Sequence, residues 1–264
     1  MVQRRLKLMV LAAASAGFAT TSSAAIRISE FSVNPPGADN GWEWFELLST
    51  GGGIEGLDGL SLINVEGDFG GNAGAVDKVI SLNGFSTGSN GLFLWRDAAT
   101  ELVPARDPAT TLHVQDFNPD WENPSGTFLL VSGFTGAQGD DLDTDDNGVL
   151  DVLPWTAVLD GFGFTDGGST DLVYASQFGF ADFAGAAAGA AGALEAYILT
   201  PDGVQRGVGI SGSNPGPYTV DDVDAELVAV GYQLTPGSAN PVVPEPAALG
   251  LLALSSMLMV RRRR

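Results

Sequence analysis

The sequence lacks cysteine and contains one histidine, His113, among 264 residues. The absence of cysteine excludes disulfides and thiol chemistry. A single histidine excludes a zinc site built from several histidines and disfavours an ordinary acid–base site. Carboxylates are abundant, but no motif singles out a catalytic pair of them. The composition therefore favours a protein that is not an enzyme, and a secreted hydrolase with a carboxylate site is the alternative.

Basic residues are also scarce, and most of them lie at the two ends of the chain. Of twelve Lys and Arg, three lie within residues 4–7 and four within 261–264, whereas only one of the 32 acids, Glu245, lies in either end. Residues 26–242 therefore carry 31 acids and five bases, a net charge of −26. Such a surface repels nucleic acid and anionic lipid and favours divalent cations. We expect no nucleic-acid partner.

No apolar run in the sequence reaches the length of an ordinary membrane span, which needs about 20 residues. The C-terminal run, Ala247 to Val260, has fourteen apolar or small residues, begins after Pro244-Glu245-Pro246 and ends at four arginines. The prolines discourage a helix from starting earlier, and the arginines keep the end of the tail on the cytoplasmic side of a membrane. A C-terminal core helix is the alternative, which four consecutive arginines disfavour. The tail has the features of a targeting signal.

The N-terminus has the layout of a secretory signal peptide. A basic start, with Arg4, Arg5 and Lys7, precedes the apolar stretch from Leu8 to Phe18, and small residues follow. Ser23 and Ala25 suit the cleavage site. Residues 1–25 are therefore predicted to direct export through the inner membrane and to be removed.

The C-terminal tail, taken with this export signal, resembles the PEP-CTERM sorting signal of Gram-negative bacteria over residues 243–264. The resemblance implies that an exosortase recognises the tail, which associates transiently with the membrane as a sorting helix, and cuts near the proline motif. The protein is then expected to be secreted or held at the cell surface. The matching residues outside the apolar run are Val243, Pro244, Glu245, Pro246, Arg261, Arg262, Arg263 and Arg264.

Between the two signals, short stretches rich in β-branched and aromatic residues alternate with glycine-rich turns, which predicts an all-β sandwich. In "EWFEL", Phe45 and Leu47 are expected to face the core, and Trp44 and Glu46 to face outward or towards an edge. Glycines within residues 181–199 favour a small-residue loop there over a helix. The predicted strands lie in 26–33, 42–48, 60–65, 78–82, 91–95, 127–134, 155–164, 171–175 and 195–199.

Several of these stretches resemble a lamin-tail domain, an immunoglobulin-like β-sandwich. The resemblance covers residues 26–166, with an inserted loop from Arg96 to Pro124, and residues 167–240 complete or extend the sandwich. It implies a binding or structural module without chemistry of its own. The matching stretches are Ile28-Ser29-Glu30, Glu43-Trp44-Phe45-Glu46-Leu47 and Leu57-Asp58-Gly59-Leu60-Ser61-Leu62, followed by "GTFLLVSG", "WTAVLDGFGF" and the terminal "LTPGSAN".

The stretch "GFSTG", Gly84 to Gly88, matches the G-x-S-x-G motif of hydrolases, with His113 following it. That motif requires a strand before the serine and a helix after it. Ser86 is instead followed by turn residues and then by a predicted strand. We therefore interpret this stretch as a hairpin loop.

The acidic stretch "GDDLDTDDNGVLD", residues 139–151, has the spacing of a calcium-binding loop. Oxygen ligands at positions 1, 3, 5 and 9, with glycine at position 6, are typical of an EF-hand loop. Pro154 stands where that loop has its bidentate Glu, and a solvated acidic turn is the alternative. The predicted Ca²⁺ ligands are Asp143, Asp145, Asn147, the Val149 carbonyl and Asp151.

The sequence thus predicts an exported, exosortase-processed β-sandwich that acts as a structural or binding module at the cell surface or in the extracellular matrix. Exopolysaccharide or other surface proteins are the expected partners. Tryptophans 42, 44, 95 and 121 could stack on carbohydrate if they are exposed, although tryptophan is more often a core residue.

Overall fold

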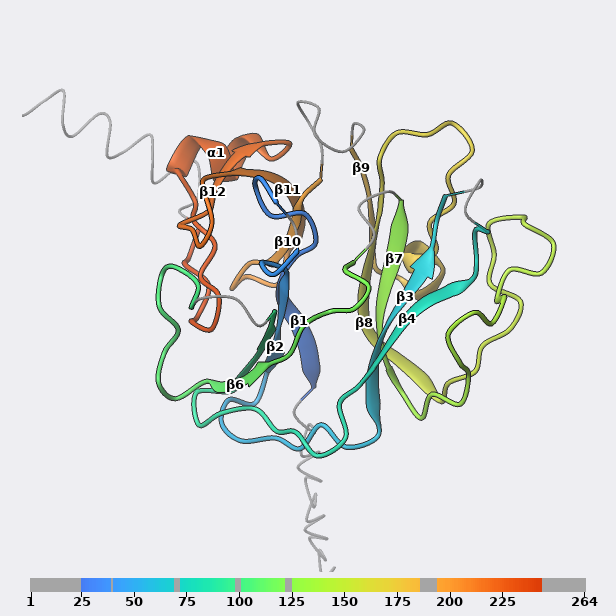
Figure 1. Cartoon of the computed structure of the whole chain (residues 1–264), viewed down its shortest axis with the longest axis horizontal. Helices are drawn as coiled ribbons and strands as arrows, with labels where there is room; N and C mark the ends of the chain where they lie inside the picture. Colours follow the sequence, from blue (N-terminus) through green and yellow to red (C-terminus); the bar gives the residue numbers. More distant parts are fainter. Residues whose placement is uncertain are drawn as a thin grey trace, which may run out of the picture.

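The computed structural model describes residues 25–38, 40–68, 72–97, 101–121, 125–185 and 194–243. Two β-sheets dominate this part of the chain and lie side by side, one to the left and one to the right in Figure 1. The α-helix α1 (Ala225–Val230) has six residues, and among the described residues no helix is long and apolar enough to cross a membrane. The predicted all-β architecture is confirmed.

The larger sheet has seven strands in the order β12-β11-β10-β1-β2-β5-β6. Its neighbours pair antiparallel, except that β6 runs parallel to β5. Strands from both ends of the chain therefore meet in one sheet. The bounds are β1 (Ile26–Ser32), β2 (Trp44–Ser49), β5 (Leu92–Arg96), β6 (Thr111–Val114), β10 (Ala196–Leu199), β11 (Gln205–Ser211) and β12 (Thr219–Asp222).

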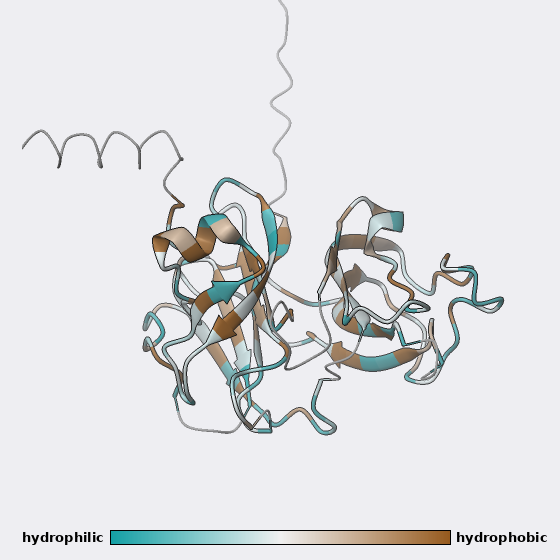
Figure 2. Cartoon of the chain, turned by 90° about the horizontal axis from the view of Figure 1, so that it is seen from above, coloured by the Kyte–Doolittle hydropathy of each residue, from teal (hydrophilic) through white to brown (hydrophobic). Residues whose placement is uncertain are grey.

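The smaller sheet has five strands in the order β4-β3-β7-β8-β9, with β9 parallel to β8 and the other pairs antiparallel. A short 3-10 helix, η2 (Ala175–Phe178), precedes β9. Viewed from above, the two sheets separate clearly and α1 lies beside the larger one (Figure 2). The bounds are β3 (Leu60–Glu66), β4 (Val76–Ser81), β7 (Gly126–Ser132), β8 (Ala157–Thr165) and β9 (Ala181–Ala184).

Eight of the nine predicted strand stretches contain a strand. The exception is 171–175, which runs without strand structure into η2, because its Leu172 and Tyr174 pack against the outer face of the smaller sheet. Strands β9 and β10 flank the small-residue stretch, whose residues 186–193 lie outside the described part. The sequence analysis missed β6, β9, β11 and β12, which are short or rich in glycine.

The core between the two sheets is aromatic. Phe31 of β1 lies 4.7 Å from Phe128 of β7, measured between ring centroids, and Phe162 of β8 stacks on Tyr197 of β10 at 4.3 Å. Phe45 and Leu47 also belong to this core, as expected. Aromatic pairs of this kind contribute about 0.5–1.5 kcal/mol each beyond the area they bury, so the rings fix the two sheets against each other.

Both outer faces of the sandwich are covered as well. The segment that contains α1 covers the larger sheet and buries Trp44, while the β7–β8 connection covers the smaller sheet through Leu142 and Leu150. Trp44 and Glu46 do face away from the central core, but they are fully buried rather than exposed. The sequence analysis expected an outward or edge position for these two residues and did not foresee the chain segments that cover the outer face of the sheet.

An ion pair connects the two sheets directly. Asp160 of β8 is fully buried and accepts hydrogen bonds from Arg27 Nε of β1 at 2.8 Å and Arg27 Nη2 at 3.2 Å. The same carboxylate accepts the backbone N–H of Ile28 at 2.8 Å. Removal of Asp160 would leave a half-buried guanidinium and a buried N–H without their acceptor.

We expect Asp160→Ala to lower the free energy of unfolding by about 3–5 kcal/mol, the usual cost of breaking a buried ion pair from one side. Urea unfolding measures this change. Glu101→Ala is the matched control, because Glu101 is 54% exposed and lies 3.9 Å from Arg106; a loss below about 1 kcal/mol is expected there. An equal decrease in the free energy of unfolding in the two variants would show that the inter-sheet ion pair stabilises the fold no more than an exposed ion pair does.

Candidate functional site

The predicted calcium loop, residues 139–151, lies in the β7–β8 connection, at the right-hand side of Figure 1. Its first part pairs with edge strand β4, because Gly139 N donates to Val76 O and Val76 N donates to Asp140 O, both at 2.8 Å. Leu142 and Leu150 anchor the loop in the outer cluster of the smaller sheet. The loop is therefore held at both ends by the fold.

Asp143 organises the turn at the centre of this loop. It is fully buried, and its carboxylate accepts the N–H groups of Asn147 at 3.1 Å and Gly148 at 2.9 Å, and the Tyr174 hydroxyl at 3.1 Å. Gly148 has φ +85°, a backbone conformation that favours glycine. Burial and the Asp143 carboxylate raise the pKa of Tyr174, which keeps its hydroxyl as a donor. The sequence analysis did not identify Tyr174 as part of this loop.

Three of the predicted ligands converge. Single carboxylate oxygens of Asp143, Asp145 and Asp151 lie within 4.8 Å of one another. Two oxygens bound to one Ca²⁺ at about 2.3–2.6 Å can be at most about 5 Å apart, so the spacing fits a shared cation. Asn147 and Val149 lie in the same turn with exposed side chains, and their part in ligation stays a prediction.

We expect Ca²⁺ to raise the melting temperature by stabilising this turn. For a Kd of about 10⁻⁴ M, as in weak extracellular sites, about 10 mM Ca²⁺ contributes roughly 2.7 kcal/mol. Mg²⁺ should contribute less, because it dehydrates reluctantly and requires stricter geometry. Thermal melts with chelator, Ca²⁺ or Mg²⁺ measure the effect.

Asp145→Asn plus Asp151→Asn should abolish the calcium shift while leaving the structural role of Asp143 intact. Asp141→Asn plus Asp146→Asn is the control, since it removes two exposed charges of the same loop outside the converging three. If Ca²⁺ stabilises both double variants equally, the effect is charge screening and no site exists at these residues.

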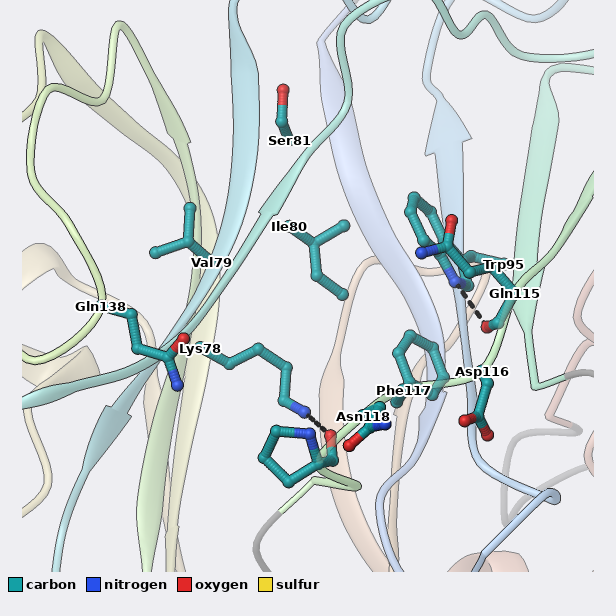
Figure 3. Close-up of a pocket in the computed structure, with 11 residues that line it drawn as sticks. Lys78, Val79, Ile80, Ser81, Trp95, Gln115, Asp116, Phe117, Asn118 and Gln138 are labelled. Atoms are coloured by element: carbon teal, nitrogen blue, oxygen red, sulfur yellow. Dashed lines mark hydrogen bonds between the residues drawn. The ribbon is translucent and has the colours of Figure 1, made fainter.

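A pocket of about 290 Å³ opens between β4 and the chain that follows β6 (Figure 3). Ile80, Trp95 and Phe117 form its apolar side, and the amide side chains of Asn118 and Gln138 are exposed at its rim. Those two amides have no hydrogen-bond partner among the described residues. The pocket thus combines an apolar floor with polar groups free to bind a ligand.

Lys78 also lines this pocket, and it is the single lysine of residues 26–243. It reaches from β4 to the opposite chain, where Nζ donates to the carbonyls of Pro119 and, at 3.2 Å, Asp120. Nζ also lies 4.8 Å from the ring centroid of Trp121, and burial lowers the pKa of this lysine. The ammonium group therefore closes one side of the pocket.

A buried acidic group lies close by. Both carboxylate oxygens of Glu43 accept the Trp121 N–H, at 2.9 and 3.1 Å, and Asp97 accepts the N–H groups of Glu43 at 3.1 Å and Phe117 at 2.9 Å. Burial raises the pKa of Glu43 to about 9 and that of Asp97 to about 6. Neither carboxyl group lines the pocket, so a substrate in the pocket does not meet them.

Two acidic groups thus escaped the sequence analysis: Glu43 with Asp97 and Asp120, and Asp68 with Asp166 and Asp171. Their members follow no motif spacing, and apart from Asp166 and Asp171 they are far apart in the sequence. The fold brings them together, so no motif in the sequence indicated them.

Ser86 does not lie in a hairpin, which corrects that expectation. It lies in the connection from β4 to β5, and these strands belong to different sheets. His113 of β6 packs against Trp95, with ring centroids 4.2 Å apart, and its Nε2 lies 3.1 Å from Gln115 Oε1. In the described part of the chain no hydrogen bond joins Ser86 to His113.

The tryptophans offer little surface for carbohydrate stacking. Trp44, Trp95 and Trp121 are at most 7% exposed, and Trp42 is half-buried against the outer cluster of the larger sheet. The stacking hypothesis is therefore wrong for the three buried rings.

Segment 234–240, the last stretch that the sequence analysis singled out, closes onto β1 and β2. Thr235 N donates to Glu30 at 2.9 Å, Gly237 N donates to Glu46 at 2.7 Å, and Asn240 Nδ2 donates to Leu199 O at 2.9 Å. Val243 packs against the same outer cluster. The remaining predicted sorting residues, Pro244 to Pro246 and Arg261 to Arg264, lie outside the described residues, as do residues 1–24.

Among known proteins, no family model matches the chain, and no curated protein shows significant sequence similarity to it.

Proposed function

We propose that the protein is exported, processed by an exosortase and placed at the cell surface or in the extracellular matrix as a non-enzymatic β-sandwich module. The layout of the fold supports this proposal. Strand β1 begins at Ile26, directly after the predicted cleavage site, and Val243 still contacts the larger sheet. The described sandwich therefore begins directly after the predicted signal peptide and reaches the first residue of the predicted sorting signal.

The proposal extends to a lamin-tail-like, immunoglobulin-like sandwich. Three of the stretches that carry the resemblance contact one another in the fold, since Glu30 and Glu46 bind the backbone of the terminal "LTPGSAN". This arrangement gives the short shared motifs a common physical role, namely closing the C-terminal segment onto β1 and β2. That role supports the resemblance.

For the module's ligand we propose a neutral stretch of exopolysaccharide, bound at the pocket beside β4. The observation that carries this proposal is the pair of unpartnered amides, Asn118 and Gln138, over an apolar floor. An amide both donates and accepts hydrogen bonds, as a sugar hydroxyl does. The net charge of −26 disfavours polyanions. The hydrolase alternative is less well supported, because Glu43 and Asp97 are buried away from the pocket.

We expect the exported protein to be retained by neutral polysaccharide in affinity electrophoresis. Loss of two hydrogen-bonding amides, in Asn118→Ala plus Gln138→Ala, should weaken retention about 30-fold, from about 1 kcal/mol for each bond. Asn40→Ala removes an exposed amide elsewhere and should leave retention unchanged. Equal retention of wild type and double variant would reject the pocket as the binding site.

We expect the exported protein to have lost both ends. Intact-mass analysis of material recovered from outside the cell should give a species that starts near Ile26 and ends near Pro244. A recovered species that still carries Arg261 to Arg264 would contradict processing by an exosortase, whatever the outcome of the polysaccharide experiment.

A further inference from the structure

A pair of carboxyl groups is enclosed beneath the C-terminal segment. Glu30 of β1 and Glu46 of β2 are register partners on the outer face of the larger sheet, and both are fully buried. Residues 232–240, which we call the closing segment, cover them. The two acids therefore lie next to each other in a site without direct access to solvent.

Each carboxyl group holds one point of the closing segment. Glu30 Oε2 accepts the Thr235 N–H at 2.9 Å, and Glu46 Oε2 accepts the Gly237 N–H at 2.7 Å. Within the described residues Glu46 Oε1 and the hydroxyl of Tyr232 are buried and have no hydrogen-bond partner. The site thus contains polar atoms that the hydrogen bonds to the closing segment leave without partners.

No positive charge among the described residues compensates this pair. Across the ladder, Glu30 faces Ile198 of β10 and Glu46 faces Leu94 of β5, and the surrounding outer cluster is apolar. Among the described residues, Tyr232 of the closing segment is the other titratable group that interacts with both acids. Arg106 packs against Gly237, but its guanidinium donates to the carbonyls of Asp107 and Thr110. Two buried carboxylates side by side cannot both ionise without a large desolvation and repulsion cost. A proton is the remaining means of neutralising them.

We propose that Glu30 and Glu46 form a proton-operated clasp, in which a proton held by the pair keeps the closing segment on β1 and β2, and loss of protons releases it. The clasp does not depend on the proposed export or on polysaccharide binding. It assigns to the terminal "LTPGSAN" stretch a conformational equilibrium controlled by the pH of the surroundings.

The direction of the pKa shifts agrees with this geometry. Burial, followed by repulsion from Glu46, raises the pKa of Glu30 well above its usual value. Burial also raises the pKa of Glu46 to about 8, although hydrogen bonds from Ser29 and Gly237 oppose the rise. An exposed Glu titrates near about 4.3. The closed form therefore binds more protons than the open form, and its stability is lost as pH rises from about 4.3 to about 8.

Hydrogen exchange read by mass spectrometry on the full exported protein tests the clasp. After correction for the intrinsic pH dependence of exchange, protection of residues 232–240 should fall about tenfold per pH unit between pH 5 and pH 8 for each proton released. Glu46→Gln keeps an oxygen for Gly237 N–H but cannot ionise, so the slope should become clearly shallower. Glu30→Gln should act in the same way and serves as the second variant.

Glu43→Gln is the matched control, because Glu43 is another buried acid with a raised pKa but binds Trp121 rather than the closing segment. Its profile for residues 232–240 should follow that of the wild type. Protection that does not change with pH in the wild type, or a slope that stays as steep as in the wild type in both Glu46→Gln and Glu30→Gln, would overturn the proposal.

Discussion

Buried backbone N–H groups need acceptors, and this requirement governs the structure outside its sheets. Irregular chain covers both outer faces of the sandwich, so its N–H groups lie where neither water nor a ladder partner is available. On these outer faces, buried carboxylates of Asp143, Glu30 and Glu46 supply the acceptors. Other buried carboxylates do the same around the central core. Asp97, Asp143, Asp160, Glu30, Glu43 and Glu46 each accept at least one backbone N–H, often from a residue far away in the sequence.

The acidic composition consequently has two physical roles. Exposed acids such as Asp145 and Asp151 repel one another at the surface, whereas buried acids accept backbone N–H groups of loops. Burial raises the pKa of three of these buried acids, Glu30, Glu43 and Glu46. The formal charge of −26 therefore exceeds the charge carried at neutral pH, since burial keeps Glu43 largely protonated. In the proposed clasp, Glu30 and Glu46 make the position of the closing segment depend on the pH of the medium. The closing segment lies immediately before the predicted processing motif, with only Pro241 to Val243 between them.

The sequence analysis located the strands that are rich in β-branched and aromatic residues. It failed where tertiary packing, rather than local composition, determines whether a stretch forms a strand. Strand β11 contains Gly207, which looks unfavourable for a strand, yet a Cβ there would lie 2.7 Å from the Phe183 ring. The glycine is required by that close packing. Tyr174 lies in a stretch whose composition predicted a strand. Its side chain packs against the outer face of the smaller sheet instead, and the stretch forms no strand. For the candidate sites, the loop spacing marked Asp143, Asp145 and Asp151, while Glu43 and Asp97 become neighbours only through the pairing of β2 with β5.

The few cations between residues 26 and 243 have a consequence for the protein's resistance to proteases that cut after lysine or arginine. Arg27 and Arg206 are held in ion pairs, and Lys78 and Arg96 are each 8% exposed. Arg106 donates to the carbonyls of Asp107 and Thr110. Proteolysis requires a segment that can leave the fold and enter a protease cleft in extended form. Enzymes that cut after lysine or arginine thus meet five sites between residues 26 and 243, each tied into the structure, and digestion by them waits on unfolding.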